Sequence, residues 1–194
     1  MKASEAYSLG ILAGGSGRRW GGRDKGLLCL AGRPLIGTLY ASRSHRITET
    51  LVCCRENPWL YQHFADRVLC ETVPNRGPCG GIVALLAAAT MSEITILPTD
   101  LIGNPTVVIE QLEEAWLSTD RALFLTDSEG KPSPCMRISR NLLGKCEQYL
   151  NLGGTRITGL LSAISARSVK VPSQWLIDAD DPETLRSYTD LIEQ

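Results

Sequence analysis

A basic, glycine-rich loop near the start of the chain contains the residue types best suited to chemistry. The loop directly follows the apolar run Tyr7–Leu12, and its basic members are Arg18, Arg19, Arg23 and Lys25. Glycines let backbone N–H groups approach a ligand without an obstructing Cβ atom. Arginine binds phosphate oxygens through paired hydrogen bonds, and lysine binds them as a point charge. The loop therefore predicts a site for phosphate groups.

Two common phosphate-binding motifs do not fit this loop. No Gly-Lys-Ser/Thr sequence closes it, so it is not a P-loop. Gly15-Ser16-Gly17 is followed by Trp20 where the dinucleotide motif requires a glycine. A merely solvated loop is the alternative, but such a loop would not need a strand before it. Because the net charge of the chain is −1, the basic loop is a local feature, and we expect no nucleic-acid partner.

Acidic side chains follow two later apolar runs. Asp100 comes after Ile94–Leu97, a run that predicts a buried strand, and Asp178 and Asp180 follow the run near the end of the chain. Alternate residues of a strand point the same way, so we expect Asp180 to face Asp100. Mg²⁺ is bound by few protein carboxylates together with waters and phosphate oxygens. The pattern predicts Asp100 and Asp180 as magnesium ligands, although Asp100 alone would also suit a helix cap.

Strands and helices alternate along the chain, with no linker and no repeat of fixed period. The predicted strands are Tyr7–Leu12, Glu49–Cys54, Arg67–Cys70, Ile94–Leu97, Arg121–Leu125, Ser133–Ile138, Ser168–Val171 and Trp175–Ile177. The predicted helices are Pro34 to about His45, Pro58–Ala65, Gly81–Met91, Thr106–Leu117, Ser139–Leu150, Gly153–Ile164 and Pro182–Ile192.

This alternation predicts a single α/β domain over residues 1–194, with a mostly parallel, mixed sheet between two layers of helices. Ligands in such folds bind at the carboxyl ends of the strands. The loops 13–25, 71–81 and 98–104 each follow a predicted strand, so we expect them to share one edge of the sheet.

The seven cysteines suggest a reducing compartment. Their number is odd, none has C-x-x-C spacing, and the two histidines, His45 and His63, are not spaced as metal ligands with them. We therefore expect free thiols and no zinc site. No run approaches the ~18 apolar residues that a membrane span needs. The expected location is the cytoplasm, without a membrane partner.

The segment Leu12–Leu35, LAGGSGRRWGGRDKGLLCLAGRPL, resembles the signature of the molybdenum cofactor guanylyltransferases. These belong to the nucleotide-diphospho-sugar transferase-like superfamily, whose fold is Rossmann-like. Trp20 stands where that family usually has methionine. The resemblance implies transfer of GMP from GTP to the phosphate of molybdopterin, with Mg²⁺ as cofactor and pyrophosphate as product. It also implies protein partners, namely other molybdenum cofactor biosynthesis proteins and molybdoenzymes.

The resemblance extends to individual site residues. It implies catalytic roles for Arg19, Lys25 and Asp100, and magnesium binding by Asp100. The implied nucleotide contacts are Leu12, Ala13, Gly14, Gly15, Lys25, Glu71 and Asp100. Asp178–Glu183 resembles the family segment N-x-N-x-P-E with aspartates in place of both asparagines, which adds Asp180 to the metal site.

Glu71 and Arg156 complete the predicted site, and each has an alternative role. Glu71 falls where the family has an acidic residue, usually aspartate, that faces the guanine base; a surface glutamate is the alternative. The N-terminal part of the chain would bind the nucleotide, and the C-terminal part the acceptor. Lys131–Cys135 and Gly153–Arg156 lie where the family binds the pterin, and Arg156 is the candidate contact, against a surface role.

Two other functions stay open at this point. One is a cytidylyltransferase acting on molybdopterin or another phosphorylated acceptor. Related cytidylyltransferases tend to carry L-A-A-G, so Ala13-Gly14-Gly15 favours guanine. The other is a non-catalytic nucleotide-binding module, which would have a broken metal site, whereas Lys25, Asp100 and Asp180 are all present.

Overall fold

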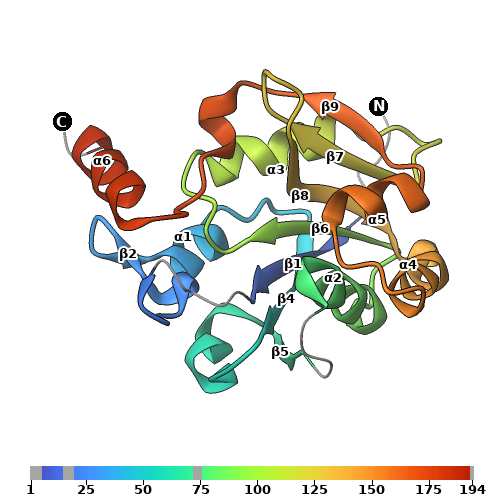
Figure 1. Cartoon of the computed structure of the whole chain (residues 1–194), viewed down its shortest axis with the longest axis horizontal. Helices are drawn as coiled ribbons and strands as arrows, with labels where there is room; N and C mark the ends of the chain where they lie inside the picture. The colour runs from blue at the N-terminus through green and yellow to red at the C-terminus, as the bar shows by residue number, and fades with distance from the viewer. Residues whose placement is uncertain (1–5, 15–19, 72–75, 193–194) are drawn as a thin grey trace.

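A seven-stranded sheet forms the centre of the molecule (Figure 1). The computed structural model describes residues 6–14, 20–71 and 76–192. The strands are β1 (Tyr7–Ala13), β4 (Ile47–Cys54), β5 (Arg67–Cys70), β6 (Glu93–Pro98), β7 (Ala122–Thr126), β8 (Pro132–Ser139) and β9 (Arg167–Lys170). Their order is β5-β4-β1-β6-β8-β7-β9, and β8 runs antiparallel to both of its neighbours while the other pairs are parallel. The predicted mixed α/β fold is confirmed.

Helices cover both faces of this sheet (Figure 1). They are α1 (Leu35–Ala41), α2 (Gly77–Ala88), α3 (Pro105–Glu114), α4 (Leu143–Asn151), α5 (Ile157–Ala163) and α6 (Pro182–Ile192), with short 3-10 helices η2 (Lys25–Leu27), η3 (Pro58–Phe64), η4 (Arg140–Leu142) and η5 (Ser173–Leu176). One face packs on α2, α4 and α5, and the other on α1, α3 and η3. α6 packs beside the hairpin β2 (Cys29–Leu30) and β3 (Arg33–Pro34). In the described ranges, no helix combines the length and apolar character that a membrane crossing would require.

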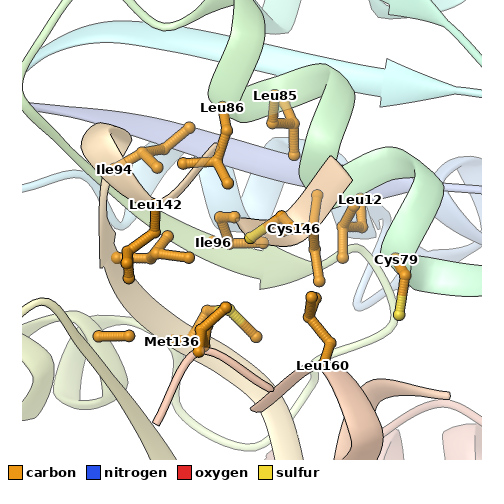
Figure 2. Packing of buried hydrophobic residues seen from close by; sticks show 14 of the residues in the cluster. Leu12, Cys79, Leu85, Leu86, Ile94, Ile96, Met136, Leu142, Cys146 and Leu160 are labelled. Atoms are coloured by element: carbon orange, nitrogen blue, oxygen red, sulfur yellow. The ribbon is translucent and has the colours of Figure 1, made fainter. Parts of the chain in front are cut away.

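The larger core lies between the sheet and the α2, α4 and α5 layer (Figure 2). Leu12, Ile96 and Met136 project from three strands towards Leu85 of α2 and Leu160 of α5. All five are at most 8% exposed. Because successive strand residues face opposite sides, the neighbours of these strand positions build the second core on the other face.

A glycine sets the distance between β1 and α2. A Cβ atom on Gly10 would lie 3.0 Å from Cδ1 of Leu85 and 2.9 Å from Cδ1 of Ile94. Glycine therefore lets these side chains pack directly on the backbone of β1. In the sheet, β1 lies between β4 and β6.

Several predicted elements differ in the structure. The predicted helix Gly153–Ile164 begins only at Ile157, and Pro58–Ala65 is a 3-10 helix over Pro58–Phe64. α2 begins at Gly77 rather than Gly81, because Pro78 in its first turn suits a helix start. α1 ends at Ala41, before His45. The predicted strand Trp175–Ile177 is wrong: this segment includes the end of η5. Its carbonyl groups accept hydrogen bonds from the loop after β6 instead of from a neighbouring strand of the sheet.

The cysteines behave as small apolar residues. All seven are free thiols, and five of them are buried: Cys53, Cys54, Cys79, Cys135 and Cys146. Burial raises the pKa of the Cys53 thiol to about 12, so this thiol stays protonated at neutral pH. Cys53 of β4 is packed in the core.

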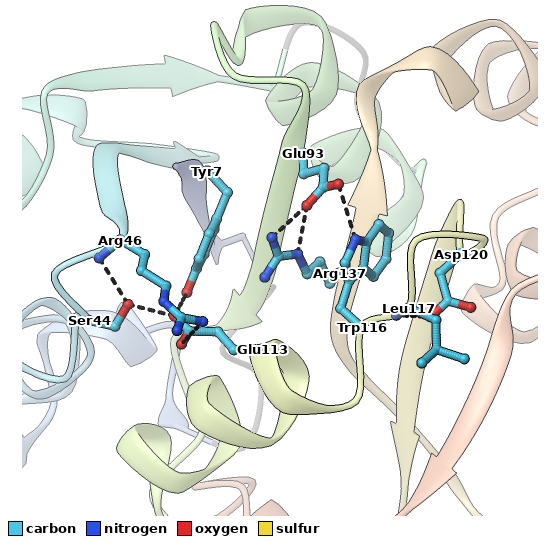
Figure 3. A network of polar contacts seen from close by, with 9 residues as sticks. All are labelled: Tyr7, Ser44, Arg46, Glu93, Glu113, Trp116, Leu117, Asp120 and Arg137. Carbon is cyan, nitrogen blue, oxygen red and sulfur yellow. Dashed lines mark hydrogen bonds and ion pairs between the residues drawn. The ribbon is translucent and has the colours of Figure 1, made fainter. Parts of the chain in front are cut away.

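A polar network ties α3 to the amino ends of the central strands (Figure 3). The hydroxyl of Tyr7 donates to Glu113 at 2.5 Å. Nearby, Nε of Arg137 donates to Glu93 at 3.0 Å, and its guanidinium lies 4.2 Å from the ring centroid of Tyr7 and 5.1 Å from that of Trp116. Arg137 is only 5% exposed, so its charge depends on these partners.

We predict that Arg137→Met lowers the free energy of unfolding by about 3 kcal/mol, because removing one partner leaves a poorly solvated charge on Glu93. Urea denaturation at neutral pH measures the change. The control is Arg140→Met, at an exposed position three residues after Arg137. It should change stability by less than about 0.5 kcal/mol. Equal effects of the two substitutions would show that the ion pair of Arg137 with Glu93 does not contribute to the free energy of unfolding.

Candidate active site

A cleft of about 1010 Å³ opens at the carboxyl ends of the parallel strands. Its described walls come from the ends of β1, β4, β5 and β6, the first turn of α2, Pro134 of β8 and the segment after η5. The predicted meeting of the loops after β1, β5 and β6 at one edge of the sheet is therefore confirmed. Among the described lining residues, six are acidic and three basic; the basic ones are Arg23, Lys25 and Arg55.

The ammonium group of Lys25 lies between two carboxylates in this cleft. Its Nζ is 2.8 Å from Oδ2 of Asp100 and 3.1 Å from Oδ1 of Asp180. Burial acts to lower the pKa of Lys25, but the hydrogen bonds and charges of both aspartates outweigh burial and raise it. Lys25 is therefore a permanent cation at neutral pH, and it joins residues from three distant parts of the sequence.

Backbone pairing brings the two carboxylates together. The N–H of Ala179 donates to the carbonyl of Asp100 at 2.6 Å, and Leu101 forms an isolated β-bridge with Asp178. The predicted proximity of Asp180 and Asp100 is confirmed, but for a different reason. Residues 178 and 180 are related by a tight turn, in which the N–H of Asp180 donates to the carbonyl of Asp178 at 2.8 Å, and not by strand alternation.

The donor set of this corner suits a hard divalent cation. Oδ1 of Asp178 is buried and has no hydrogen-bond partner in the described structure. Burial raises the pKa of Asp178 to about 7, and the charges of Asp100 and Asp180 act in the same direction. Across the described residues, no group of three or more metal-ligating side chains forms a ready-made site. A magnesium ion needs fewer, since waters and phosphate oxygens complete its coordination.

Glu71 lies on the side of the cleft formed by β1 and β5. Its N–H donates to the carbonyl of Cys54 at 3.0 Å, and its Oε1 would be 3.0 Å from a Cβ atom on Gly14. Glycine at position 14 therefore leaves room for this carboxylate. Burial raises the pKa of Glu71, and the charge of Arg55 opposes that rise. Leu12 and Ala13 line the same wall, where the Leu12 carbonyl accepts from the N–H of Thr99 at 3.0 Å.

Three of the predicted site residues are not part of this described cleft. Gly15 and Arg19 lie outside the described residues, so their roles remain predictions. Arg156 precedes α5, is exposed, and does not line the described cleft. Its carbonyl accepts a hydrogen bond from the Tyr149 hydroxyl at 2.9 Å. A contact of Arg156 with the acceptor also stays a prediction.

The sequence interpretation missed several residues that line or support the cleft. Arg55 and Asn57 lie in the loop after β4 and line the cleft. Since ligands in such folds bind at the carboxyl ends of strands, the sequence could have predicted these two residues as well. Asp178 was grouped with Asp180 but given no role. The indole N–H of Trp20 donates to the carbonyl of Ala179 at 3.2 Å and so links the glycine-rich loop to the carboxylate segment. No local sequence pattern predicts this contact, because Trp20 and Ala179 are far apart in the sequence.

Comparison with known proteins identifies relatives of this chain. The family profile described as a MobA-like NTP transferase domain matches residues 9–169. A molybdenum cofactor guanylyltransferase of Pseudomonas fluorescens is 31% identical, over 93% of this chain and 92% of that protein. One of Pseudomonas paraeruginosa is 38% identical, over 95% of each.

Solved structures show the same fold. Molybdopterin-guanine dinucleotide biosynthesis protein A from Archaeoglobus fulgidus aligns with a TM-score of 0.77, covering 96% of this chain and 98% of that one. At 19% sequence identity, that alignment shows likeness of fold alone. The family profile and the bacterial relatives carry the assignment further: the chain belongs to the family of MobA-like NTP transferase domain proteins.

Proposed function

We propose that this protein transfers GMP from GTP to the terminal phosphate of molybdopterin and releases pyrophosphate. The observation that carries the proposal is Lys25, held between Asp100 and Asp180 at the end of a glycine-rich loop. A cation and two carboxylates at one edge of a parallel sheet suit a triphosphate and its divalent ion. The bacterial relatives that cover nearly the whole chain are named molybdenum cofactor guanylyltransferases.

The reaction mainly requires that the acceptor phosphate be aligned with the α-phosphorus of GTP and that the charge on the leaving pyrophosphate be stabilised. The acceptor phosphate is already ionised at pH 7, so no general base is needed. One of its oxygens forms a bond to the α-phosphorus of GTP while the bond from that phosphorus to the bridging oxygen of pyrophosphate breaks. Lys25 would stabilise the negative charge that develops on the leaving pyrophosphate. Arg19 is proposed to assist it, as the motif implies.

Magnesium dependence is part of the proposal. Asp100 and Asp180 would hold the ion, with Asp178 beside them. When bound, Mg²⁺ neutralises phosphate charge and helps to orient the triphosphate. Lys25 pairs with both of these carboxylates and would share with the ion the task of balancing negative charge in the cleft.

Base selection is assigned to Glu71 and the backbone at the end of β1. A carboxylate can accept from N1–H and from the 2-amino group of guanine together, which adenine does not offer in that geometry. The wall formed by Leu12, Ala13 and Gly14 would lie beside the ring. A cytidylyltransferase is the competing function. A cytidylyltransferase would not need this pair of acceptor oxygens, because cytosine does not offer the N1–H and the 2-amino group of guanine.

The acceptor is proposed to enter from the side lined by Pro134 and Asp178, with Arg156 as a more distant contact. Those residues belong to the second half of the chain, so nucleotide and acceptor would divide the single domain between them. Delivery of the product to other cofactor biosynthesis proteins or molybdoenzymes is likewise a proposal. A reducing cytoplasm suits the seven free cysteines.

The direct test is turnover with purified molybdopterin and each of the four nucleoside triphosphates, followed by pyrophosphate release. GTP should be the best substrate. Inosine triphosphate, which lacks the 2-amino group, should be poorer by about tenfold, since a hydrogen bond to a charged group contributes about 1.5–3 kcal/mol. If CTP were best, the guanylyl assignment would be replaced by the cytidylyl one.

Glu71→Gln should remove most of the preference for GTP over inosine triphosphate, because the amide presents a single acceptor oxygen. The preference should also fall as pH is lowered. Burial raises the pKa of Glu71, so protonation removes the acceptor at a higher pH than for an ordinary glutamate. Glu71→Gln should lack that pH dependence. An unchanged ratio of catalytic efficiencies in the variant would leave the reaction standing but end the role given to Glu71.

Lys25→Ala should lower kcat by about 10²–10³, the size of losing one donor that stabilises transition-state charge. The matched control is Lys145→Ala, an exposed residue of α4 outside the cleft, which should leave kcat unchanged. Circular dichroism should find both variants folded. Near-parental turnover in folded Lys25→Ala would exclude Lys25 from the mechanism.

Asp100→Asn should shift the Mg²⁺ titration of activity to a higher midpoint while GTP binding in the presence of a chelator stays largely intact. The reason is that a neutral amide is a weaker ligand for a hard cation than a carboxylate. Asp190→Asn, at an exposed position of α6, is the control. Identical midpoints in the parent and Asp100→Asn would rule out metal binding by Asp100.

A further inference from the structure

A buried tyrosine supports the turn that carries Lys25. Tyr61 belongs to η3 on one face of the sheet and has no solvent exposure. Its hydroxyl donates to Oδ1 of Asp24 at 2.5 Å. The same oxygen accepts the N–H of Gly26 at 3.1 Å. One carboxylate oxygen, itself held by Tyr61, thus fixes the residues on both sides of Lys25.

The turn also packs directly against this hydroxyl. A Cβ atom on Gly26 would lie 2.7 Å from Oη of Tyr61 and 3.3 Å from Cγ2 of Thr99. Gly26 is therefore enclosed between the tyrosine and the residue that precedes Asp100. The N–H of Leu28 donates to the carbonyl of Lys25 at 3.1 Å, which closes the short helix η2. The backbone of Lys25 has little freedom to rotate.

The hydroxyl is a dependable donor. Burial raises the pKa of Tyr61 far above neutrality, and the hydrogen bond to Asp24 acts in the same direction. Tyr61 therefore stays protonated at every pH at which the enzyme would work. Since Asp24 accepts from both Tyr61 and Gly26, loss of the hydroxyl would free its carboxylate to turn towards the open cleft that it lines.

We propose that Tyr61 is a positioning residue for nucleotidyl transfer: through Asp24 it holds Lys25 so that the ammonium reaches between Asp100 and Asp180. Tyr61 is buried behind the turn and does not line the described cleft, so its effect passes through Asp24 and Gly26. This role rests on the proposed function for its catalytic consequence. Its structural part, the placement of Lys25, can be measured without turnover.

The protein provides a matched control for removing this hydroxyl. Tyr7 is also fully buried, and its hydroxyl also donates to a carboxylate, Glu113, at 2.5 Å (Figure 3). It lies at the opposite end of β1 from the cleft. Tyr7→Phe and Tyr61→Phe remove the same atom from similar surroundings. Only Tyr61→Phe should affect Lys25.

The first measurement is the rate of reductive methylation of Lys25 by formaldehyde and cyanoborohydride, followed by peptide mass spectrometry. In the parent, the contacts with Asp100 and Asp180 shield the amine from the reagent. In Tyr61→Phe, Lys25 should react at least about threefold faster than in the parent, because an ammonium that no longer reaches both carboxylates is more accessible. In Tyr7→Phe the rate should equal that of the parent.

The second measurement is kcat with GTP and molybdopterin. It should fall by about tenfold or more in Tyr61→Phe, since small displacements of a catalytic group have large effects on rate. Tyr7→Phe should keep the parental kcat. Asp24→Asn gives an independent check: adding Tyr61→Phe to it should cause little further loss, because both changes break one network.

Parental Lys25 reactivity in folded Tyr61→Phe, or an equal change in Tyr7→Phe, would overturn the positioning role. Full additivity of Asp24→Asn and Tyr61→Phe would also overturn it. If the parent does not use GTP, the proposed function fails. The Lys25 reactivity then still decides whether Tyr61 positions this lysine.

Discussion

The ion pairs of Lys25 are the contact on which the geometry of the cleft depends. They join the loop after β1, the turn after β6 and the segment after η5, three pieces that are far apart in the sequence. Burial, and then the negative charges of Asp100 and Asp180, raise the pKa of Asp178, so these carboxylates oppose one another's ionisation. A cation among them relieves that repulsion. Lys25 provides it, and the turn that carries Lys25 is thereby held at the carboxylates.

Close backbone approaches place the groups that make these ion pairs. A Cβ atom on Gly103 would lie 2.4 Å from the carbonyl oxygen of Trp175, so the pairing that aligns Asp100 with Asp178 requires glycine there. Gly26 lies similarly close to the hydroxyl of Tyr61, and Gly14 leaves room for the carboxylate of Glu71. The glycines in and around the cleft therefore do more than expose N–H groups to phosphate. Each one lets a polar side chain or a backbone segment come close without meeting a Cβ atom.

Much of this arrangement could be predicted from the sequence, because the signals are local. Apolar runs bounded by glycine and proline marked the sheet strands, and Asp100 directly after β6 had to lie at the carboxyl edge. The error at Trp175–Ile177 arose because a short apolar segment has no period that separates strand from 3-10 helix. Its hydrogen bonds go to the loop after β6, a partner more than 70 residues away in the sequence. The supporting roles of Trp20 and Tyr61 were missed for the same reason, since both depend on tertiary contacts.

The position of Asp180 in the chain has a consequence for folding during synthesis. All seven strands of the sheet are complete by Lys170, before the segment that supplies Asp178 and Asp180 is made. Chains fold from the amino end as they are translated, and contacts distant in sequence form late. A nascent chain that has released β9 from the ribosome can thus assemble its sheet and most of its core while the cleft still lacks one wall. The active site would be the last part of the molecule to close, after the scaffold on which it depends is already in place.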